Sequence, residues 1–549
     1  MSQVFKRLPF LQWPRPTAAL ARREVVAGLT VGLMVIPQAV AYAALAGMPL
    51  ITGIYASMLP ALIAVLFSAS SRLSVGPTAL TATLVSASLT GLAEPGSASW
   101  VNQAVWLCIF TGSLQLLLGF ARFGWLLNLV SSPVLTGFTQ AAAVYIILSQ
   151  IPALLGMPGN WGSAMAPSSW NLNALEIGVI SLMILMAARR WRPTFPTVLV
   201  VVISSSLASQ WLGLPDQPDL TIGTLPQGLP DFYVPSVLSW EGYTNLALPA
   251  LAITLVSFLE TASSAKVDND QAGKTWDQDQ DLIGQGLAKL ASGFCGAFPT
   301  SSSFSRSALN LYAGAQTGWA TVVSVGLIWL GLVYLTPVLQ PVPQSVLAAI
   351  VIVAVLGLIK PKALLQIHKV DRIEASTALI TFTVTLLCVP RLYWGVLAGI
   401  LAALCHFLYV RMHPRIIEVG LHPDGSLRDR HLWHLPALAP HLYALRMDAA
   451  LDFAAAAAFE KNIVATINAQ PDIQHICLFA VPINRIDLTG TETISKLEKK
   501  LQALGITLHI SGMKLPVETV LRRAGCLKPN AYLKMYRTDT EALAVLRNL

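Results

Sequence analysis

Long apolar stretches follow one another from about residue 25 to about residue 410, and few charges interrupt them. Stretches of about 20 apolar residues match a helix that crosses a bilayer, whereas the strands of a membrane barrel alternate over about 10 residues. Only 12% of the 549 residues are charged, against about 25% in a typical soluble domain. The sequence therefore predicts an α-helical polytopic membrane protein.

We expect fourteen membrane spans, of which the third and the tenth are short and interrupted by glycine or proline. The predicted spans are 25–46, 50–69, 77–93, 103–121, 125–154, 172–189, 195–213, 246–266, 280–297, 303–314, 317–337, 344–359, 372–389 and 392–411. The basic segment 1–24 has no apolar core before a small-residue cleavage site, so we interpret it as a cytoplasmic lead-in and not as a signal peptide.

Lysine and arginine gather in the loops after even-numbered spans, for example at Arg189 after the sixth and at Lys360 and Lys362 after the twelfth. The loop 214–245, after the seventh span, contains neither, and Arg391 is the one exception to the pattern. Because basic loops stay in the cytoplasm, both termini are predicted to be cytoplasmic. These cations account for the net charge of +8, and no basic run interleaved with aromatics indicates nucleic-acid binding.

The composition changes after Arg415. Residues 436–549 alternate β-branched strands with amphipathic helices, which predicts a small cytosolic α/β domain. The polar residues 416–435 are interpreted as a linker, and residues 25–415 as the transmembrane domain. The six cysteines show no paired spacing, and no motif indicates a metal site, a cofactor or an enzyme active site.

The two interrupted spans hold the same position, the third, in two successive sets of seven spans. Because seven is odd, the second set would cross the membrane in the opposite orientation to the first. Inverted repeats with two discontinuous helices that meet at the midplane are typical of secondary transporters. The pattern therefore predicts two inverted seven-segment repeats.

Two ionisable residues stand out inside the predicted spans, namely Glu260 in the eighth and Arg306 in the tenth. Charge within a membrane span indicates a functional site by default, because it is costly to bury. The alternative is a salt bridge that only locks two helices together. Every histidine lies at position 368 or later, so no histidine relay runs through the first repeat.

Both interrupted spans begin with proline and small hydroxyl residues, in SVGPTAL (74–80) and FPTSSSFSRSALN (298–310). A helix start presents free N–H groups and about half a positive charge, and so forms a ready site for an anion. Two such starts that face each other, together with Arg306, would hold a small anion. The alternative is a pair of proline-kinked packing helices, which leaves Arg306 unexplained.

These stretches resemble the sulfate permease (SulP) family of anion transporters, which includes the animal solute-carrier anion exchangers and prestin. The resemblance is carried by GLTVGLMVIPQAVAYAALAGMPLITGIYASMLPALIAVLFSASSRLSVGPTAL, SFLETASSAK and DLIGQGLAKLASGFCGAFPTSSSFSRSALNLYAGAQT. It implies a UraA-like fold, a homodimer in a bacterial inner membrane and a C-terminal STAS domain. It also implies a core of spans 1–4 and 8–11 that moves like an elevator against a gate of spans 5–7 and 12–14.

The resemblance further implies which residues face the anion. They would come from the first span (Gln38 and Tyr42), the third (Thr78 and Ala79) and the tenth (Ser303, Phe304, Ser305 and Arg306). Glu260 matches the acid that couples transport to protons, and related sodium–bicarbonate members use aspartate in that region. A glutamate here therefore favours protons over sodium.

The STAS domain departs from its relatives at DLTG, where Leu488 replaces the usual serine. Thr489 occupies the phosphoacceptor position, although a helix-start turn explains the same residues. We expect proton-coupled sulfate uptake, with C4-dicarboxylate uptake, sodium-coupled bicarbonate uptake or anion exchange as alternatives. A protein of a different class, a membrane sensor or scaffold that signals to a cytosolic partner of the STAS domain, is the remaining alternative.

Overall fold

The computed structural model describes residues 8–15, 17–157, 170–191, 196–214, 220–223, 228–334, 336–528 and 530–549. The chain divides into two compact units, residues 1–403 and 404–549. Each unit is described by itself.

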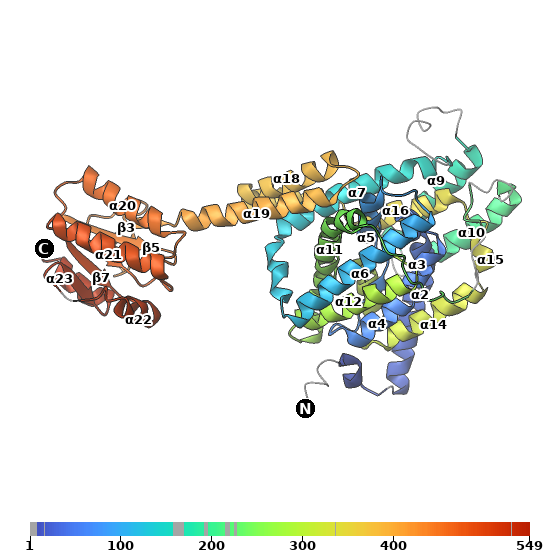
Figure 1. Ribbon diagram of the computed structural model, residues 1–549, viewed down its shortest axis with the longest axis horizontal. Helices are drawn as coiled ribbons and strands as arrows, with labels where there is room; N and C mark the ends of the chain where they lie inside the picture. Colours follow the sequence, from blue (N-terminus) through green and yellow to red (C-terminus); the bar gives the residue numbers. More distant parts are fainter. Residues whose placement is uncertain are drawn as a thin grey trace. The chain divides into compact units, whose positions relative to one another are not determined.

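The first unit is helical, and each of the fourteen predicted spans contains at least one helix within its described residues (Figure 1). The first half contains α2 (Ala18–Leu45), α3 (Ile51–Ala56), α4 (Leu59–Phe67), α5 (Ala79–Leu89), α6 (Ala98–Phe120), α7 (Ser132–Leu154), α9 (Leu172–Trp191) and α10 (Thr197–Trp211), with 3-10 turns at Pro9–Gln12 and Gly124–Leu129. The second half contains α11 (Trp240–Ala272), α12 (Gln278–Phe294), α13 (Phe304–Tyr312), α14 (Trp319–Tyr334), α15 (Thr336–Leu339), α16 (Gln344–Leu356), α17 (Pro361–Val370), α18 (Arg372–Leu387) and α19 (Tyr393–Met412), whose last turns belong to the second unit.

Seven helices of the described chain are each long and apolar enough to cross a membrane, and several others are shorter apolar helices. Some boundaries differ from the prediction. Helix α2 begins at Ala18, inside the predicted lead-in, because the Thr17 side chain caps it by accepting a hydrogen bond from the Leu20 N–H. The second span consists of two helices, and the fifth begins at Ser132 after a 3-10 turn.

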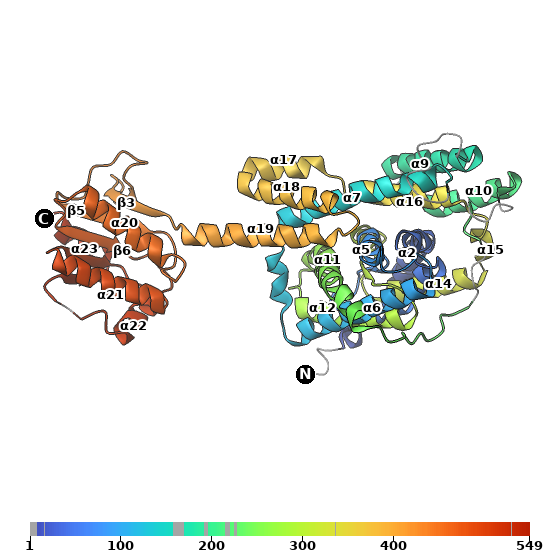
Figure 2. The same ribbon diagram turned by 45° about the horizontal axis from the view of Figure 1, so that its top comes forward.

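The helices pack in two sets. In one set, α6 packs against α12 and α2 against α14, while in the other α7 packs against α16 and α18 (Figures 1 and 2). Small residues allow the closest contacts. A Cβ atom added to Gly112 of α6 would lie 2.8 Å from the Gly286 carbonyl oxygen of α12, and a Cβ atom on Gly286 would lie equally close to the Gly112 oxygen. Such close backbone approach is how helices associate in membranes.

The two interrupted spans meet as predicted. Strand β1 (Val75–Gly76) precedes α5, strand β2 (Ser301–Ser302) precedes α13, and the two strands pair antiparallel. Each broken span thus consists of a two-residue strand followed by a short helix, and the two helix starts lie on either side of one small sheet. This pairing joins the two halves of the first unit.

The second unit contains a six-stranded sheet in the order β4-β3-β5-β6-β7-β8. Its strands are β3 (Ile416–Leu421), β4 (Leu427–Asp429), β5 (Leu442–Met447), β6 (His475–Phe479), β7 (Thr507–Ser511) and β8 (Leu533–Tyr536). The last four are parallel, and β3 runs antiparallel to β5 and β4.

The interpretation of residues 416–435 as a linker is wrong, because these residues contribute the edge strand β4 and its neighbour β3 to the sheet. The sequence IIEVGL alternates in burial, with Ile417 and Val419 facing an apolar cluster of the unit. The burial of these apolar residues stabilises the strand, although polar residues flank it in the sequence. The α/β domain therefore begins at β3.

Helices cover both faces of this sheet. Helices α20 (Ala456–Ala469), α21 (Leu488–Ala503) and α22 (Leu515–Arg523) pack on one apolar cluster, and α23 (Asp539–Leu546) packs on the other. Alternate residues of each strand serve the two clusters, as a two-sided parallel sheet requires. On β6, for example, Leu478 faces the first cluster and Cys477 the second.

A buried histidine contacts side chains on the two neighbouring strands of this sheet. His509 on β7 lies 3.3 Å from the His475 ring and 3.0 Å from the Tyr536 hydroxyl, in contacts between its ring nitrogens and these groups. Burial, and to a smaller extent the charges of His475 and Lys534, lowers the pKa of His509 to about 4. The neutral ring is therefore the form that the folded domain holds.

We predict that the α/β domain loses stability as the pH falls from about 6.5 toward 4. The unfolded chain binds a proton at His509 in this window and the folded chain does not, so acid favours unfolding, by about 2 kcal/mol at pH 5. Hydrogen exchange of the β7 amides at pH 7 and pH 5 would measure this. His509→Gln should flatten the dependence, and the exposed control His434→Asn should keep it. An unchanged slope in His509→Gln would contradict the assignment.

Candidate functional site

The candidate site includes the N-terminal ends of α5 and α13. Thr78 is the N-cap of α5, and its hydroxyl accepts a hydrogen bond from the Thr81 N–H at 3.3 Å. Ser303 is the N-cap of α13, and its N–H donates to the Ser74 carbonyl across the two strands. The side chain of Ser303 makes no cap bond and lies 3.4 Å from the Ser305 hydroxyl. The first-turn N–H groups of α13 therefore remain available to a ligand.

Arg306 is almost fully buried and is held against the opposite half-helix. Its Nη1 donates to the Pro77 carbonyl at 2.9 Å, and its Nε donates to the Ser74 hydroxyl at 3.3 Å. Its Nη2 has no hydrogen-bond partner in the described chain, and a Cβ atom on Gly76 would lie 3.3 Å from it. A buried guanidinium with a free donor can bind an oxyanion.

Glu260 does not form an ion pair with Arg306 in the described structure. Its Oε2 instead accepts hydrogen bonds from the hydroxyls of Thr78 and Thr81, at 3.0 and 3.2 Å. Arg306 remains near enough for an electrostatic interaction. The alternative of a helix-locking salt bridge between these two residues is therefore wrong for this conformation, and Glu260 acts on the cap of α5 instead.

The first span contributes two of the predicted residues. Gln38 on α2 is buried, and its Oε1 has no hydrogen-bond partner in the described chain. Tyr42, one turn later, is also buried and interacts electrostatically with Arg306 and Glu260. Both residues therefore lie beside the two half-helix starts.

A cavity of about 330 Å³ opens at the site. Gln38 of α2, Ser305 of α13 and Arg189 of α9 are among its polar lining residues. Apolar residues of α10 and α16 complete the lining. Among the remaining predicted residues, Ala79 is buried at the start of α5, and Phe304 is 53% exposed.

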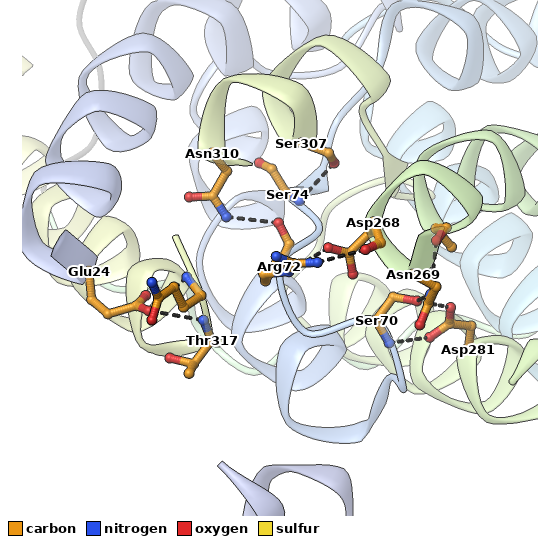
Figure 3. A network of polar contacts seen from close by, with 12 residues as sticks. Glu24, Ser70, Arg72, Ser74, Asp268, Asn269, Asp281, Ser307, Asn310 and Thr317 are labelled. Atoms are coloured by element: carbon orange, nitrogen blue, oxygen red, sulfur yellow. Dashed lines mark hydrogen bonds and ion pairs between the residues drawn. The ribbon is translucent and has the colours of Figure 1, made fainter. Parts of the chain in front are cut away.

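The connector between α4 and α5 is fixed by charged and polar residues of the second half (Figure 3). Arg72 forms an ion pair with Asp268 at 2.6 Å and receives a bond at its carbonyl from Asn310. The N–H and hydroxyl of Ser70 both donate to Asp281, at 3.0 and 2.6 Å. These bonds hold the strand β1 in register with β2 from one side.

The sequence predicts one deep carboxylate and one deep guanidinium, and that count is wrong. Lys289 on α12 and Asp281 on the same helix are fully buried, and Glu24 on α2 is nearly so. Lys289 lies inside the predicted ninth span, so its charge was a usable signal. Glu24 accepts bonds from three N–H groups at 316, 317 and 320, and so caps the start of α14.

Thr489 lies in the second unit, on the exposed first turn of α21. Asp487 is the N-cap of that helix and accepts bonds from the Gly490 and Phe453 N–H groups. A helix-start turn accounts for this arrangement, and phosphorylation of Thr489 stays a prediction.

Comparison with known proteins identifies the family. The sulfate permease family matches residues 22–381, and the STAS domain matches residues 438–542. The chain belongs to the sulfate permease family. This permease is 31% identical over 533 residues to a probable sulfate transporter 4.2 of Arabidopsis thaliana, covering 92% of this chain and 78% of that one. It is 30% identical over 518 residues to a probable sulfate transporter of Mycobacterium tuberculosis, covering 92% of each.

The fold of the permease is that of a solved animal transporter. The murine solute carrier 26 family member A9, an anion transporter in the inward-facing state, matches with a TM-score of 0.87 and 18% identity, over 100% of this chain and 95% of that one. The transmembrane domain of the cyanobacterial bicarbonate transporter BicA matches with a TM-score of 0.60 and 17% identity, over 71% and 98%. The α-helical membrane fold with a C-terminal STAS domain is thereby confirmed.

Thr78→Val should destabilise the permease by about 1 kcal/mol, because valine keeps the shape of threonine but removes the cap of α5. Thr78→Ser keeps the hydroxyl and should behave like the wild type. Thermal unfolding of the purified protein in detergent compares the three. Equal destabilisation by serine and valine would contradict the capping role.

Proposed function

We propose that this permease is a secondary active transporter that takes up sulfate together with protons by an elevator movement. The observation that carries the proposal is the meeting of two half-helix starts beside a buried arginine with a free donor. Gln38 and Ser305, in the first turn of α13, line one cavity. Arg306 is the next residue after Ser305, and its Nη2 has no hydrogen-bond partner in the described chain. The family and the sulfate transporters that it resembles support a small oxyanion as the substrate.

The chemistry of the site suits an anion with several oxygens. Backbone N–H groups at a helix start donate toward it, and the two helix dipoles add positive potential. A guanidinium presents several donors in a fixed plane, which matches an oxyanion. Small residues such as Ala79 and Ser305 let the anion approach the backbone closely.

Glu260 supplies the coupling to protons in this proposal. A dianion that enters an inside-negative cell must overcome about 2.3 kcal/mol per charge for each 100 mV. A proton carried on Glu260 offsets part of that cost and removes a negative charge beside the anion. Burial favours the protonated acid, and the hydrogen bonds from Thr78 and Thr81 link its state to the start of α5.

The packing supports an elevator. Helices α2–α6 and α11–α14 would form the moving core, and α7, α9, α10 and α16–α19 the gate. The cavity is lined by helices of both sets, namely α2 and α13 of the proposed core and α9, α10 and α16 of the proposed gate. We further propose a homodimer with both termini in the cytoplasm of a bacterial cell, on the basis of the basic loops and the family.

Glu260→Gln should abolish the stimulation of sulfate uptake by an inward proton gradient, because glutamine keeps the hydrogen-bonding shape but takes up no proton. Uptake of radiolabelled sulfate into liposomes, with and without a pH gradient and sodium, measures this. Unchanged proton stimulation in Glu260→Gln would refute the coupling role. Stimulation by sodium in place of protons would refute the choice of coupling ion.

Arg306→Ala should lower sulfate affinity at least 100-fold, since a charge-assisted hydrogen bond and a full charge are lost together. Arg391→Ala is the control, because it removes an exposed arginine from the loop between α18 and α19. Binding is measured on purified protein by calorimetry, with bicarbonate and succinate beside sulfate. Sulfate affinity retained in Arg306→Ala would contradict the anion site. If none of these anions passed through liposomes that contain the permease, the alternative of a membrane sensor or scaffold would be favoured.

A further inference from the structure

Lys289 is a fully buried lysine in the middle of α12. Its ammonium donates to the Gln115 side-chain oxygen of α6 at 2.9 Å. The ion pairs of the described chain do not include Lys289. An ammonium buried at a close-packed helix interface costs stability unless another charge compensates it or the lysine loses its proton. A bound anion would compensate the charge and keep the proton on Lys289.

A short chain of hydrogen bonds leads from Lys289 to the candidate site. Gln115 donates to the Ser257 hydroxyl of α11 at 3.1 Å, and the Ser257 carbonyl accepts from the Ser301 hydroxyl of β2 at 3.0 Å. Ser257 lies one turn before Glu260 on α11, and Ser301 lies two residues before the cap of α13. Hydrogen bonds therefore connect Lys289 to the helix that carries Glu260 and to the strand that precedes α13.

The charged and titratable groups around this region come from several helices. Tyr42 of α2, Arg306 of α13 and Lys289 of α12 interact electrostatically with Glu260, and Cys108 of α6 interacts with Lys289. The facing residues of α5 and β2, Thr78, Thr81 and Ser301, are hydroxyls. Asp281 and Glu24 are bonded elsewhere, to Ser70 and to the start of α14.

We propose that Lys289 is the second positive charge of the anion site and makes the site specific for a dianion. When Glu260 is protonated, Arg306 and Lys289 leave the core with two positive charges, and a bound sulfate neutralises both. A core with Arg306 alone would match a monovalent anion instead. Lys289 does not touch the anion, so it is a specificity-determining residue that acts through its field.

The proposal rests on the anion site proposed above, but not on proton coupling. An electrostatic effect of Lys289 on binding can be told apart from a change in the shape of the site. The electrostatic energy is proportional to the charge of the ligand, whereas the effect of a changed shape is not. The loss of a distant cation should therefore weaken a dianion by twice as much, on a logarithmic scale, as a monovalent anion. Damage to the packing would weaken both anions alike.

The test is binding of inorganic sulfate and nitrate to the purified full-length permease in detergent, at constant ionic strength and pH. Lys289→Met should weaken sulfate about tenfold and nitrate about threefold. Lys289→Arg keeps the charge and should bind both anions as the wild type does. Arg306→Ala, measured beside it, reports whether the anion site itself is correctly placed.

Gln115→Glu provides a second route if Lys289→Met does not fold. The substitution places a carboxylate against the Lys289 ammonium and neutralises its charge while the lysine stays in place. The logarithmic loss of sulfate affinity should therefore again be twice that of nitrate affinity. Equal losses for sulfate and nitrate, or sulfate binding within twofold of the wild type in the variant that folds, would overturn the proposal.

Discussion

Inside a bilayer the backbone has no water to bond to, so a broken span must satisfy its N–H and C=O groups with protein. Here each of the two broken spans provides backbone hydrogen-bond partners for the other. Val75 and Gly76 pair with Ser301 and Ser302, and the Ser303 N–H bonds to the Ser74 carbonyl. The pairing fixes two helix starts on one sheet at the centre of the unit, and every proposed contact with the anion depends on that placement.

The buried charges of the permease fall into two groups. Glu24 caps α14 with three hydrogen bonds, and Arg72 pairs with Asp268, so these charges are compensated and stabilise the fold. Arg306 and Lys289 are different. Arg306 keeps one donor free, and Lys289 has an amide and no carboxylate beside it. A buried cation without a carboxylate partner costs stability, and an anion bound in the working protein, as proposed, would offset that cost.

The sequence predicted the features that local chemistry determines. Glycine and proline mark the broken spans, and charge in an apolar run marks Glu260 and Arg306. Contacts between distant residues could not be foreseen in the same way. The bond from Thr78 to Glu260 joins residues far apart in the chain, and a two-residue strand such as Val75–Gly76 has no pattern of its own. Strand β3 was missed because its short alternation lies among polar residues.

In the proposed mechanism, the contact of Thr78 with Glu260 links the proton to the anion through a single hydroxyl. That hydroxyl lies 3.0 Å from both the Glu260 Oε2 and the Thr81 hydroxyl, and it has only one proton to donate. When Glu260 is ionised, Thr78 and Thr81 both donate to it. When Glu260 is protonated it can donate to Thr78, which then turns its own proton toward Thr81. Because Thr78 is also the cap of α5, the protonation of Glu260 would change the hydrogen bonds at the helix start that is proposed to face the anion.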